Sequence, residues 1–393
     1  MKKDNKDLIA ENLREVTAAD TATKHEATSA EIVGTDKDKS DAGPHGKTAL
    51  GLVDRTEKTA DGEGKVAIPE LLTVTPAPHI RHRDNTTSIM LDVVFALLPA
   101  LAWGTYVFGI RALLVCLITS GSCIIFEYLT QRILKRPVTI ADCSALVTGL
   151  LLGMNLPATA PAWLAVVGSA FAIIVVKQIF GGLGHNVFNP ALAARVFLSL
   201  AWPTQMTAFT APFARLLFSS ADAVTSATPL VSLNKGVLPG ESLLDMLLGS
   251  NGGTIGEVSA LFLLLGGIYL LVRKVISWYI PVSYIGTVAL LTFILPRGDI
   301  GRLDYMLYSV LAGGLIIGAF FMATDYVTSP VTPRGRLIFG AGAGLIVVFI
   351  RYFGGYPEGV SFSILIMNSL VWYIEKISRP HVFGGVKKHG KKA

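Results

Sequence analysis

The chain has 393 residues, of which 51% are hydrophobic and only 16% are charged, and its mean hydropathy is +0.54. These values exclude an ordinary soluble globular protein of this length and predict an all-α polytopic membrane protein. The net charge of +6 does not indicate a nucleic-acid partner, because Lys and Arg are concentrated in the tails and one set of loops. In a membrane protein that distribution reports topology.

Residues 1–70 have the composition of a disordered arm. They mix Lys, Asp, Glu, Thr and Gly without aromatic side chains, so they bury too little apolar surface to offset chain entropy. They also lack the charged, apolar and small-residue order of a secretory signal peptide. We expect a polar cytoplasmic arm, followed at 75–83 by a basic, proline-containing lead-in to the first membrane segment.

About ten apolar windows follow, each near the length that crosses about 30 Å of hydrocarbon. The first repeat, placed within 71–205, contains windows 88–108, 110–132, 141–156, 162–180 and 191–203. The second, within 256–376, contains windows 256–272, 277–295, 304–324, 337–353 and 360–374. Residues 206–255 form the long polar loop between them, and 377–393 form a basic tail.

The basic residues fall on alternate loops. One set of loops and the tail hold Arg132, Lys135, Arg136, Arg273, Lys274, Arg334, Arg336, Lys387, Lys388, Lys391 and Lys392. The opposite short loops hold chiefly Arg111, Arg297 and Arg302. Because cytoplasmic loops carry the excess of Lys and Arg, both termini are expected in the cytoplasm and the loop 206–255 outside.

A pair of glycine motifs suggests an internal repeat. Gly149 and Gly153 in the third window are spaced like Gly314 and Gly318 in the eighth, which is the corresponding window of the second set. Repeats of five crossings must be inverted in the membrane, and they place binding sites where the halves meet. Small residues at this spacing also allow helices to approach closely. The alternative to an internal repeat is a chance match between Gly-rich helices.

Charged residues are sparse in the apolar windows. We expect them all toward the cytoplasmic half of their helices, and they are Asp92, Glu127, Asp142, Lys177, Arg195 and Asp325. A charge at mid-bilayer costs about 2.5 to 3.5 kcal/mol, so a charge-poor centre argues against a carboxylate-relay carrier. It favours a scaffold that holds electron carriers. Cys116, Cys123 and Cys143 form no CxxC pair and are expected to pack as small apolar residues in helices. A membrane iron-sulfur ligand set is the alternative, and no metal ligand is assigned.

Two loops on the predicted cytoplasmic face are unlike plain connectors. Residues 181–190 contain Asn186 and Asn189, and residues 323–335 contain Asp325. Each loop combines polar side chains with Gly and Pro, as expected of non-helical backbone that lines a polar cavity. The two amides have the chemistry to bind the edge of a planar ring; the alternative is that they cap helix ends.

The long loop contains a polar island at 222–230. It is rich in small and hydroxylated residues, and it ends in Thr228, Pro229 and Leu230. Such a loop suits a transferase that attaches a flavin phosphate to a threonine oxygen, with Thr228 as acceptor and Asp222 holding the turn. An ordinary Ser/Thr turn is the alternative interpretation.

These stretches together resemble a known family. The order of 77–80, 181–191, 222–230, 321–325 and 354–359 is similar to the D subunits (RnfD) of Rnf-type ion-translocating electron-transport complexes. It resembles more distantly the B subunits (NqrB) of sodium-pumping NADH:quinone oxidoreductases. The likeness runs from about residue 75 to the tail, most of the chain. The long polar arm before residue 75 distinguishes this chain from shorter members of the family.

The resemblance implies cofactors, partners and a location. Thr228 would carry FMN through a phosphoester, making the chain a phosphoprotein in the chemical sense, with Thr225 and Ser226 replacing the family's usual Ser-Gly before Ala-Thr. The loop with Asn186 and Asn189 would face a second, noncovalent flavin, riboflavin in the sodium-pumping relatives. Asp325 matches a position tied to cation uptake. Implied partners are other Rnf subunits, a flavin transferase and the lipid of a bacterial inner membrane.

The resulting hypothesis is an electron-transfer subunit of a ferredoxin:NAD-type oxidoreductase that exports sodium or protons. It would not turn over alone, because the chain shows no Rossmann glycine motif or cysteine cluster, and no catalytic residue is assigned. One alternative is an NqrB-like quinone reductase subunit, although 328–335 looks more like the Rnf branch. Another is a small-solute permease, which has no use for a flavin attachment motif.

Overall fold

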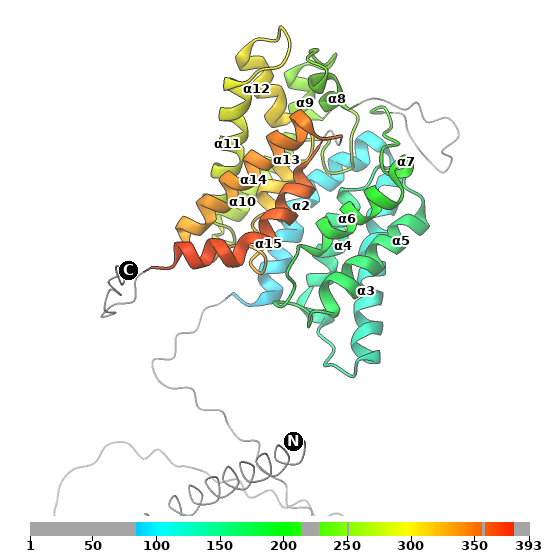
Figure 1. Ribbon diagram of the computed structural model, residues 1–393. Helices are drawn as coiled ribbons and strands as arrows, with labels where there is room; N and C mark the ends of the chain where they lie inside the picture. Colours follow the sequence, from blue (N-terminus) through cyan, green and yellow to red (C-terminus); the bar gives the residue numbers. More distant parts are fainter. Residues whose placement is uncertain (1–83, 214–227, 250, 356–357, 381–393) are drawn as a thin grey trace, which may run out of the picture. The chain divides into compact units, whose positions relative to one another are not determined.

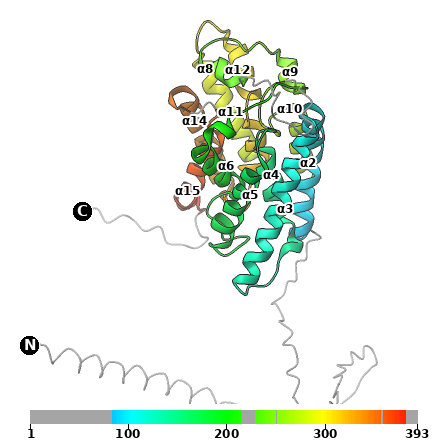
Figure 2. The ribbon, with the colours of Figure 1, turned by 90° about the vertical axis from the view of Figure 1, so that its right-hand side faces the viewer.

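The computed structural model describes residues 84–213, 228–249, 251–355 and 358–380, and the regular elements within these ranges are all helices (Figures 1 and 2). This confirms the all-α prediction. The proposed polar arm, Asp222, Thr225, Ser226 and most of the basic tail lie outside the described residues.

A helix or helix pair occupies each of the first five windows. They are α2 (Thr86–Phe108), α3 (Ile110–Ile133), α4 (Ser144–Met154), α5 (Ala162–Ala170) continuing as the π-helix η2 (Phe171–Gln178), and α6 (Pro190–Ala201). Asn85 starts α2 with a capping box, and Gly109, at φ 84°, separates α2 from α3. A 3₁₀ turn, η1 (Ile140–Asp142), precedes α4.

Short helices connect the two sets, and helices again fill the second five windows. The connectors are α7 (Pro203–Met206), α8 (Pro229–Asn234) and α9 (Leu243–Leu248). The second set is α10 (Ala260–Val272), α11 (Tyr279–Ile294), α12 (Arg302–Leu311), α13 (Leu315–Ile317) with the π-helix η3 (Gly318–Met322), α14 (Pro333–Phe353) and α15 (Val360–Ser378).

Four helices within the described ranges are long and apolar enough to cross a membrane, namely α2, α3, α14 and α15. A fifth crossing is formed if α12 and the α13–η3 segment, which meet at 63°, count as one bent span. The other windows hold shorter apolar helices of 10–17 residues. The chain is therefore a multi-pass membrane protein, while the inverted arrangement of two five-helix repeats stays a prediction.

The bend in the eighth window has an identifiable cause. Gly313 adopts φ 72° directly after α12, which interrupts the helix and frees backbone carbonyls. Arg351 from α14 satisfies two of them, donating from Nη1 to Ser309 O at 2.6 Å and from Nη2 to Ala312 O at 3.2 Å. A broken helix at membrane depth is stable because a buried side chain replaces its lost bonds.

Glycine allows α3 and α4 to touch through their backbones. A Cβ on Gly149 would lie 2.5 Å from Ser120 Cα, and one on Gly153 would lie 2.8 Å from Cys116 Cα. The close approach predicted for this glycine pair is confirmed. The matching pair in the second set behaves differently, since Gly314 and Gly318 approach the side chains of Glu358 and Val360 instead.

The two ends of the bundle carry different segments. Figures 1 and 2 show α8, α9 and α12 together at one end, while α2 begins at the other. Phe213 N donates to Val107 O at 2.9 Å, which ties the segment after α7 to the last turn of α2. A continuous hydrophobic core from both sets lies between these ends, containing for example Leu97, Leu152 and Phe339.

Candidate functional site

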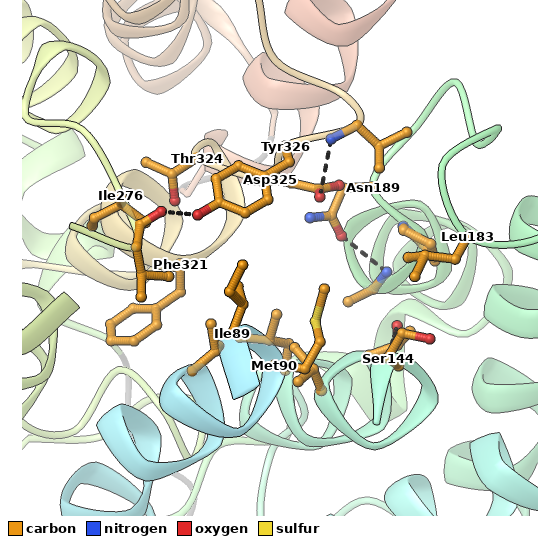
Figure 3. A pocket seen from close by; sticks show the side chains of 18 of the residues that line it. Ile89, Met90, Ser144, Leu183, Asn189, Ile276, Phe321, Thr324, Asp325 and Tyr326 are labelled. Carbon is orange, nitrogen blue, oxygen red and sulfur yellow. Dashed lines mark hydrogen bonds between the residues drawn. The ribbon is translucent and has the colours of Figure 1, made fainter. Parts of the chain in front are cut away.

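Two pockets lie toward opposite ends of this bundle. The first, which we call the Thr228 pocket, lies beside α7 and α8 and is lined by Arg195, Met206, Thr228, Asn251, Glu257, Glu358 and Ser361, among others. The second, the Asn189 pocket, lies beside the first turns of α2 and is lined by Met90, Ser144, Lys177, Asn186, Asn189 and Asp325, among others (Figure 3). The predicted site residues that the structure describes therefore divide between two places.

Thr228 stands at the start of α8. Its backbone is extended, Pro229 takes the first helical position, and the Thr228 side chain makes no capping hydrogen bond among the described residues. Leu230 and Leu233, buried against Tyr305 and its neighbours, anchor the helix that follows. The half-buried hydroxyl is thus held at the pocket by a fixed backbone without being used to start the helix.

Arg195 is the main charged group of the Thr228 pocket. Its Nη1 donates to Asn155 Oδ1 at 2.6 Å and to Glu358 Oε1 at 2.9 Å. Its Nη2 donates to Glu257 Oε1 at 3.1 Å and also to Glu358 Oε2. The Arg195 and Glu257 side chains are each only 7% exposed, so this is a buried ion-pair cluster.

The pocket also contains oxygens that have no partner. Asn251 Oδ1 and Ser361 Oγ are both buried, and neither makes a hydrogen bond within the described part of the chain. Both residues line the Thr228 pocket. Because buried polar atoms in folded proteins are nearly always satisfied, these two oxygens point to a polar ligand or to water.

In the Asn189 pocket, Asn189 is a helix cap. Its Oδ1 accepts from Ala191 N at 3.1 Å and Leu192 N at 3.3 Å, and its Nδ2 donates to Met322 O at 3.3 Å. The capping interpretation is therefore confirmed for Asn189. Asn186 instead bonds within its own loop, with Nδ2 donating to Phe188 O at 3.0 Å.

Asp325 closes a turn at the edge of the same pocket. Its carboxylate accepts from Val327 N at 3.4 Å and from Thr328 Oγ1 at 3.1 Å, and Figure 3 shows it on the pocket wall beside Asn189. Asp325 lies in the loop after η3, and burial raises the pKa of its carboxyl group. Asp325 is thus a partly buried carboxyl group on the pocket wall.

A second ion pair borders the Asn189 pocket through Lys177. Lys177 Nζ contacts Glu127 Oε1 at 2.8 Å and donates to Ser144 Oγ at 2.6 Å, and both charged side chains are almost fully buried. Gln178 Nε2 adds a donor to Glu127 Oε1 at 2.9 Å. These charges lie at the end of the bundle that carries the Asn189 pocket.

Two more of the predicted charges lie at that end. Asp92 of α2 pairs with Arg273 at 3.0 Å, and the arginine side chain is half exposed. Asp142 Oδ1 accepts from Ser144 N at 2.8 Å and from Ser144 Oγ at 2.6 Å, at the start of α4. Asp92, Glu127, Asp142, Lys177 and Asp325 therefore share one end, as the sequence predicted.

Arg195 lies further along α6, the helix that starts beside Asn189, and it lines the Thr228 pocket. Loop 251–259 folds inward, with Gly256 N donating to Met154 O at 2.6 Å, and brings Glu257 to the Arg195 guanidinium. The expected place of Arg195 in the cytoplasmic half of its helix stays a prediction.

Sequence reasoning missed three members of this cluster. Glu257, Glu358 and Arg351 were not singled out, although each lies near a glycine-containing break. An arginine inside the apolar window 191–203 was itself a signal, because such a charge requires a buried partner.

The cysteine prediction holds for two of the three residues. Cys116 and Cys123 are buried in α3, where they pack as small apolar side chains. Cys143 is only partly buried and precedes α4 at φ 61°, so it lies outside the helix that the sequence predicted for it.

Comparison of the sequence with known proteins shows the family to which the chain belongs. Residues 73–384 match the profile of the NQR2, RnfD, RnfE family. The chain belongs to this family. It is 48% identical over 325 residues to the D subunit of the Na⁺-translocating ferredoxin:NAD⁺ oxidoreductase complex of Acetobacterium woodii, covering 81% of this chain and 98% of that protein.

Two further relatives are similar over the same region. The D subunit of the proton-translocating ferredoxin:NAD⁺ oxidoreductase complex of Clostridium ljungdahlii is 43% identical over 327 residues, covering 80% of this chain and 96% of that protein. The D subunit of the ion-translocating oxidoreductase complex of Stutzerimonas stutzeri is 41% identical over 329 residues, covering 77% and 93%. The predicted resemblance to RnfD is confirmed.

Proposed function

We propose that this chain is the RnfD-type membrane component of a ferredoxin:NAD oxidoreductase that exports sodium or protons. The observation that carries the proposal is the family match over 73–384, within which Thr228 lines a pocket that contains a buried ion-pair cluster. Ferredoxin and NAD would be handled by other subunits, so the chain works only within a complex. Relatives named for sodium and for protons are similarly close, so the proposal includes either ion.

FMN joined to Thr228 by a phosphoester is the cofactor we assign to the Thr228 pocket. The Thr228 hydroxyl is not used for capping, and Asn251 Oδ1 and Ser361 Oγ offer unpartnered oxygens to a polar ring. Arg195 also lines the pocket, where its charge is paired with Glu257 and Glu358. When bound, a flavin exchanges one or two electrons, and this chain would hold its ring and tune its potential.

The Asn189 pocket is proposed to hold a second, noncovalent flavin such as riboflavin. Asn189 uses its oxygen and one N–H for structural bonds, which leaves one N–H of its amide for a ligand. Lining groups such as Thr324 and Asp325 provide further polar contacts, while Phe321 and Leu183 provide apolar surface (Figure 3). Asp325 is the residue we propose for cation uptake at this end.

The proposed orientation puts the Thr228 pocket outside and the Asn189 pocket toward the cytoplasm of a bacterial inner membrane. The positions of two basic residues support this orientation. Arg136 donates to Gln178 O at 2.9 Å, and Arg336 donates to Ser277 Oγ at 3.0 Å. Both contacts lie at the end of the bundle that carries the Asn189 pocket. By the positive-inside rule, both termini would then lie in the cytoplasm.

In-gel fluorescence of the denatured chain tests the assignment. The chain is co-expressed with an active flavin transferase, and ultraviolet fluorescence is expected in wild type and lost in Thr228→Ala. Ser232→Ala is the control, because it removes a hydroxyl group in α8, outside the island at 222–230, and should keep the band. A dark wild-type band would overturn the flavin assignment and favour the permease alternative.

A further inference from the structure

Glu257 and Glu358 form a carboxyl pair at one guanidinium nitrogen. Each acid accepts a hydrogen bond from Arg195 Nη2, which brings the two carboxyl groups to the same side of the guanidinium. The two acids come from different loops, one before α10 and one before α15. Like charges this close in a buried site disfavour full ionisation, so the pair is suited to hold and release one proton.

The charged groups around the pair balance when both acids are ionised. Arg195 faces both acids, and Arg351 Nε donates to Glu358 O at 3.3 Å. The phenols of Tyr284 and Tyr305 are the other titratable groups that face this cluster among the described residues. Two arginines and two carboxylates cancel, so any negative charge added to the pocket is uncompensated unless a proton follows it.

The pair also has a route to water. The Glu358 side chain is 23% exposed whereas that of Glu257 is 7% exposed, so one acid reaches the pocket opening and the other lies deeper. Thr228, Glu257 and Glu358 line the same pocket. A proton can therefore enter from the aqueous side at Glu358 and be shared with Glu257, beside the group attached to Thr228.

We propose that, above the pH at which the pair already holds a proton, Glu257 and Glu358 take up one proton from water when an electron enters the Thr228 pocket, and return it when the electron leaves. The inference rests on the proposed flavin at Thr228. The electron comes from a one-electron carrier of the partner subunits, and one O–H bond forms on the carboxyl pair when this one negative charge is added. Reoxidation breaks that bond and releases the proton, so charge and atoms balance.

The test counts protons taken up during reduction of the flavin-bearing complex, using dithionite and a pH-indicator dye from about pH 6 to pH 10. Proton uptake by the flavin itself occurs in every variant, so the difference between variants is the readout. Glu257→Gln and Glu358→Gln remove the two acids separately. Asp299→Asn is the matched control, because Asp299 is an exposed carboxylate in the loop before α12.

At high pH, wild type and Asp299→Asn are expected to take up about one more proton per flavin than either glutamine variant. The excess shrinks toward low pH, where the pair already holds its proton. Equal uptake in wild type and Glu358→Gln, with the covalent flavin band intact, would overturn the inference while leaving the flavin assignment standing. A wild-type chain without the band would overturn both.

Discussion

Arg195 and Asn155 are joined by a 2.6 Å hydrogen bond, and this bond belongs to a chain of contacts between the two pockets. Asn155 Nδ2 also approaches Met322 Sδ at 3.7 Å, and Met322 O accepts from Asn189 Nδ2 at 3.3 Å. Asn189 lines one pocket and Arg195 lines the other. Asn155 and Met322 therefore form a buried polar connection between them.

Asn155→Leu is predicted to destabilise the protein by about 1 to 3 kcal/mol, because Arg195 loses an acceptor inside a buried site. Met322→Leu is the control, since it conserves volume and keeps the carbonyl that Asn189 uses, and it should cost less than about 1.5 kcal/mol. Thermal unfolding in detergent measures both. Equal losses in the two variants would show that the amide contributes nothing specific.

Arg195→Leu is predicted to be far more damaging, at about 3 to 5 kcal/mol, because it leaves two buried carboxyl groups without their cation. Arg273→Leu is the matched comparison, since its ion pair with Asp92 has a half-exposed arginine. Water screens that pair, so its loss should be clearly smaller. The yield of folded protein and its melting temperature measure the loss in each variant. A larger loss in Arg273→Leu than in Arg195→Leu would contradict the stabilising role of the buried cluster.

Stability should depend on pH through Glu257, which lies in the loop outside the helices. Burial, and then the neighbouring Glu358 carboxyl group, raise the pKa of Glu257 in the folded protein. The folded state thus keeps a proton that the unfolded chain releases, so stability falls as pH rises from the unfolded pKa toward the folded one. Melting temperatures should decline over this range in wild type and decline less in Glu257→Gln, and parallel declines would contradict the raised pKa.

Gly149→Ala is predicted to separate α3 from α4, because its Cβ would lie 2.5 Å from Ser120 Cα. Gly121→Ala lies in the same helix pair but meets nothing within 4 Å, so alanine there should be neutral or stabilise by up to about 1 kcal/mol. Size-exclusion profiles and melting temperatures distinguish the variants. A well-folded Gly149→Ala protein with an unchanged melting temperature would disprove the backbone contact.

The helices were predictable from the sequence because their apolar windows are long and are separated by Gly, Pro and polar residues. The lengths of the helices were less predictable. Window 256–272 becomes helical only at Ala260, because Ile255 N and Gly256 N donate to Leu156 O and Met154 O instead of starting a helix. Those bonds join segments distant in the chain, which local composition does not report.

The residues of the candidate site also divide into those that a local sequence pattern predicts and those that it does not. Asn189 could be named, with capping as one interpretation, because an amide before Pro-Ala is a local signal. The acids that meet Arg195 could not be named, since they lie 62 and 163 residues away in sequence. Only packing of the two helix sets decides which carboxyl groups reach a buried guanidinium.

Flavin attachment is tested most directly by mass spectrometry of the Thr228 peptide from the chain co-expressed with its flavin transferase. We predict a peptide heavier by FMN less one water, with fragment ions that locate the addition on Thr228. An unmodified Thr228 peptide, recovered under conditions in which the transferase modifies another substrate, would contradict the assignment of this chain as a flavin-bearing electron-transfer subunit.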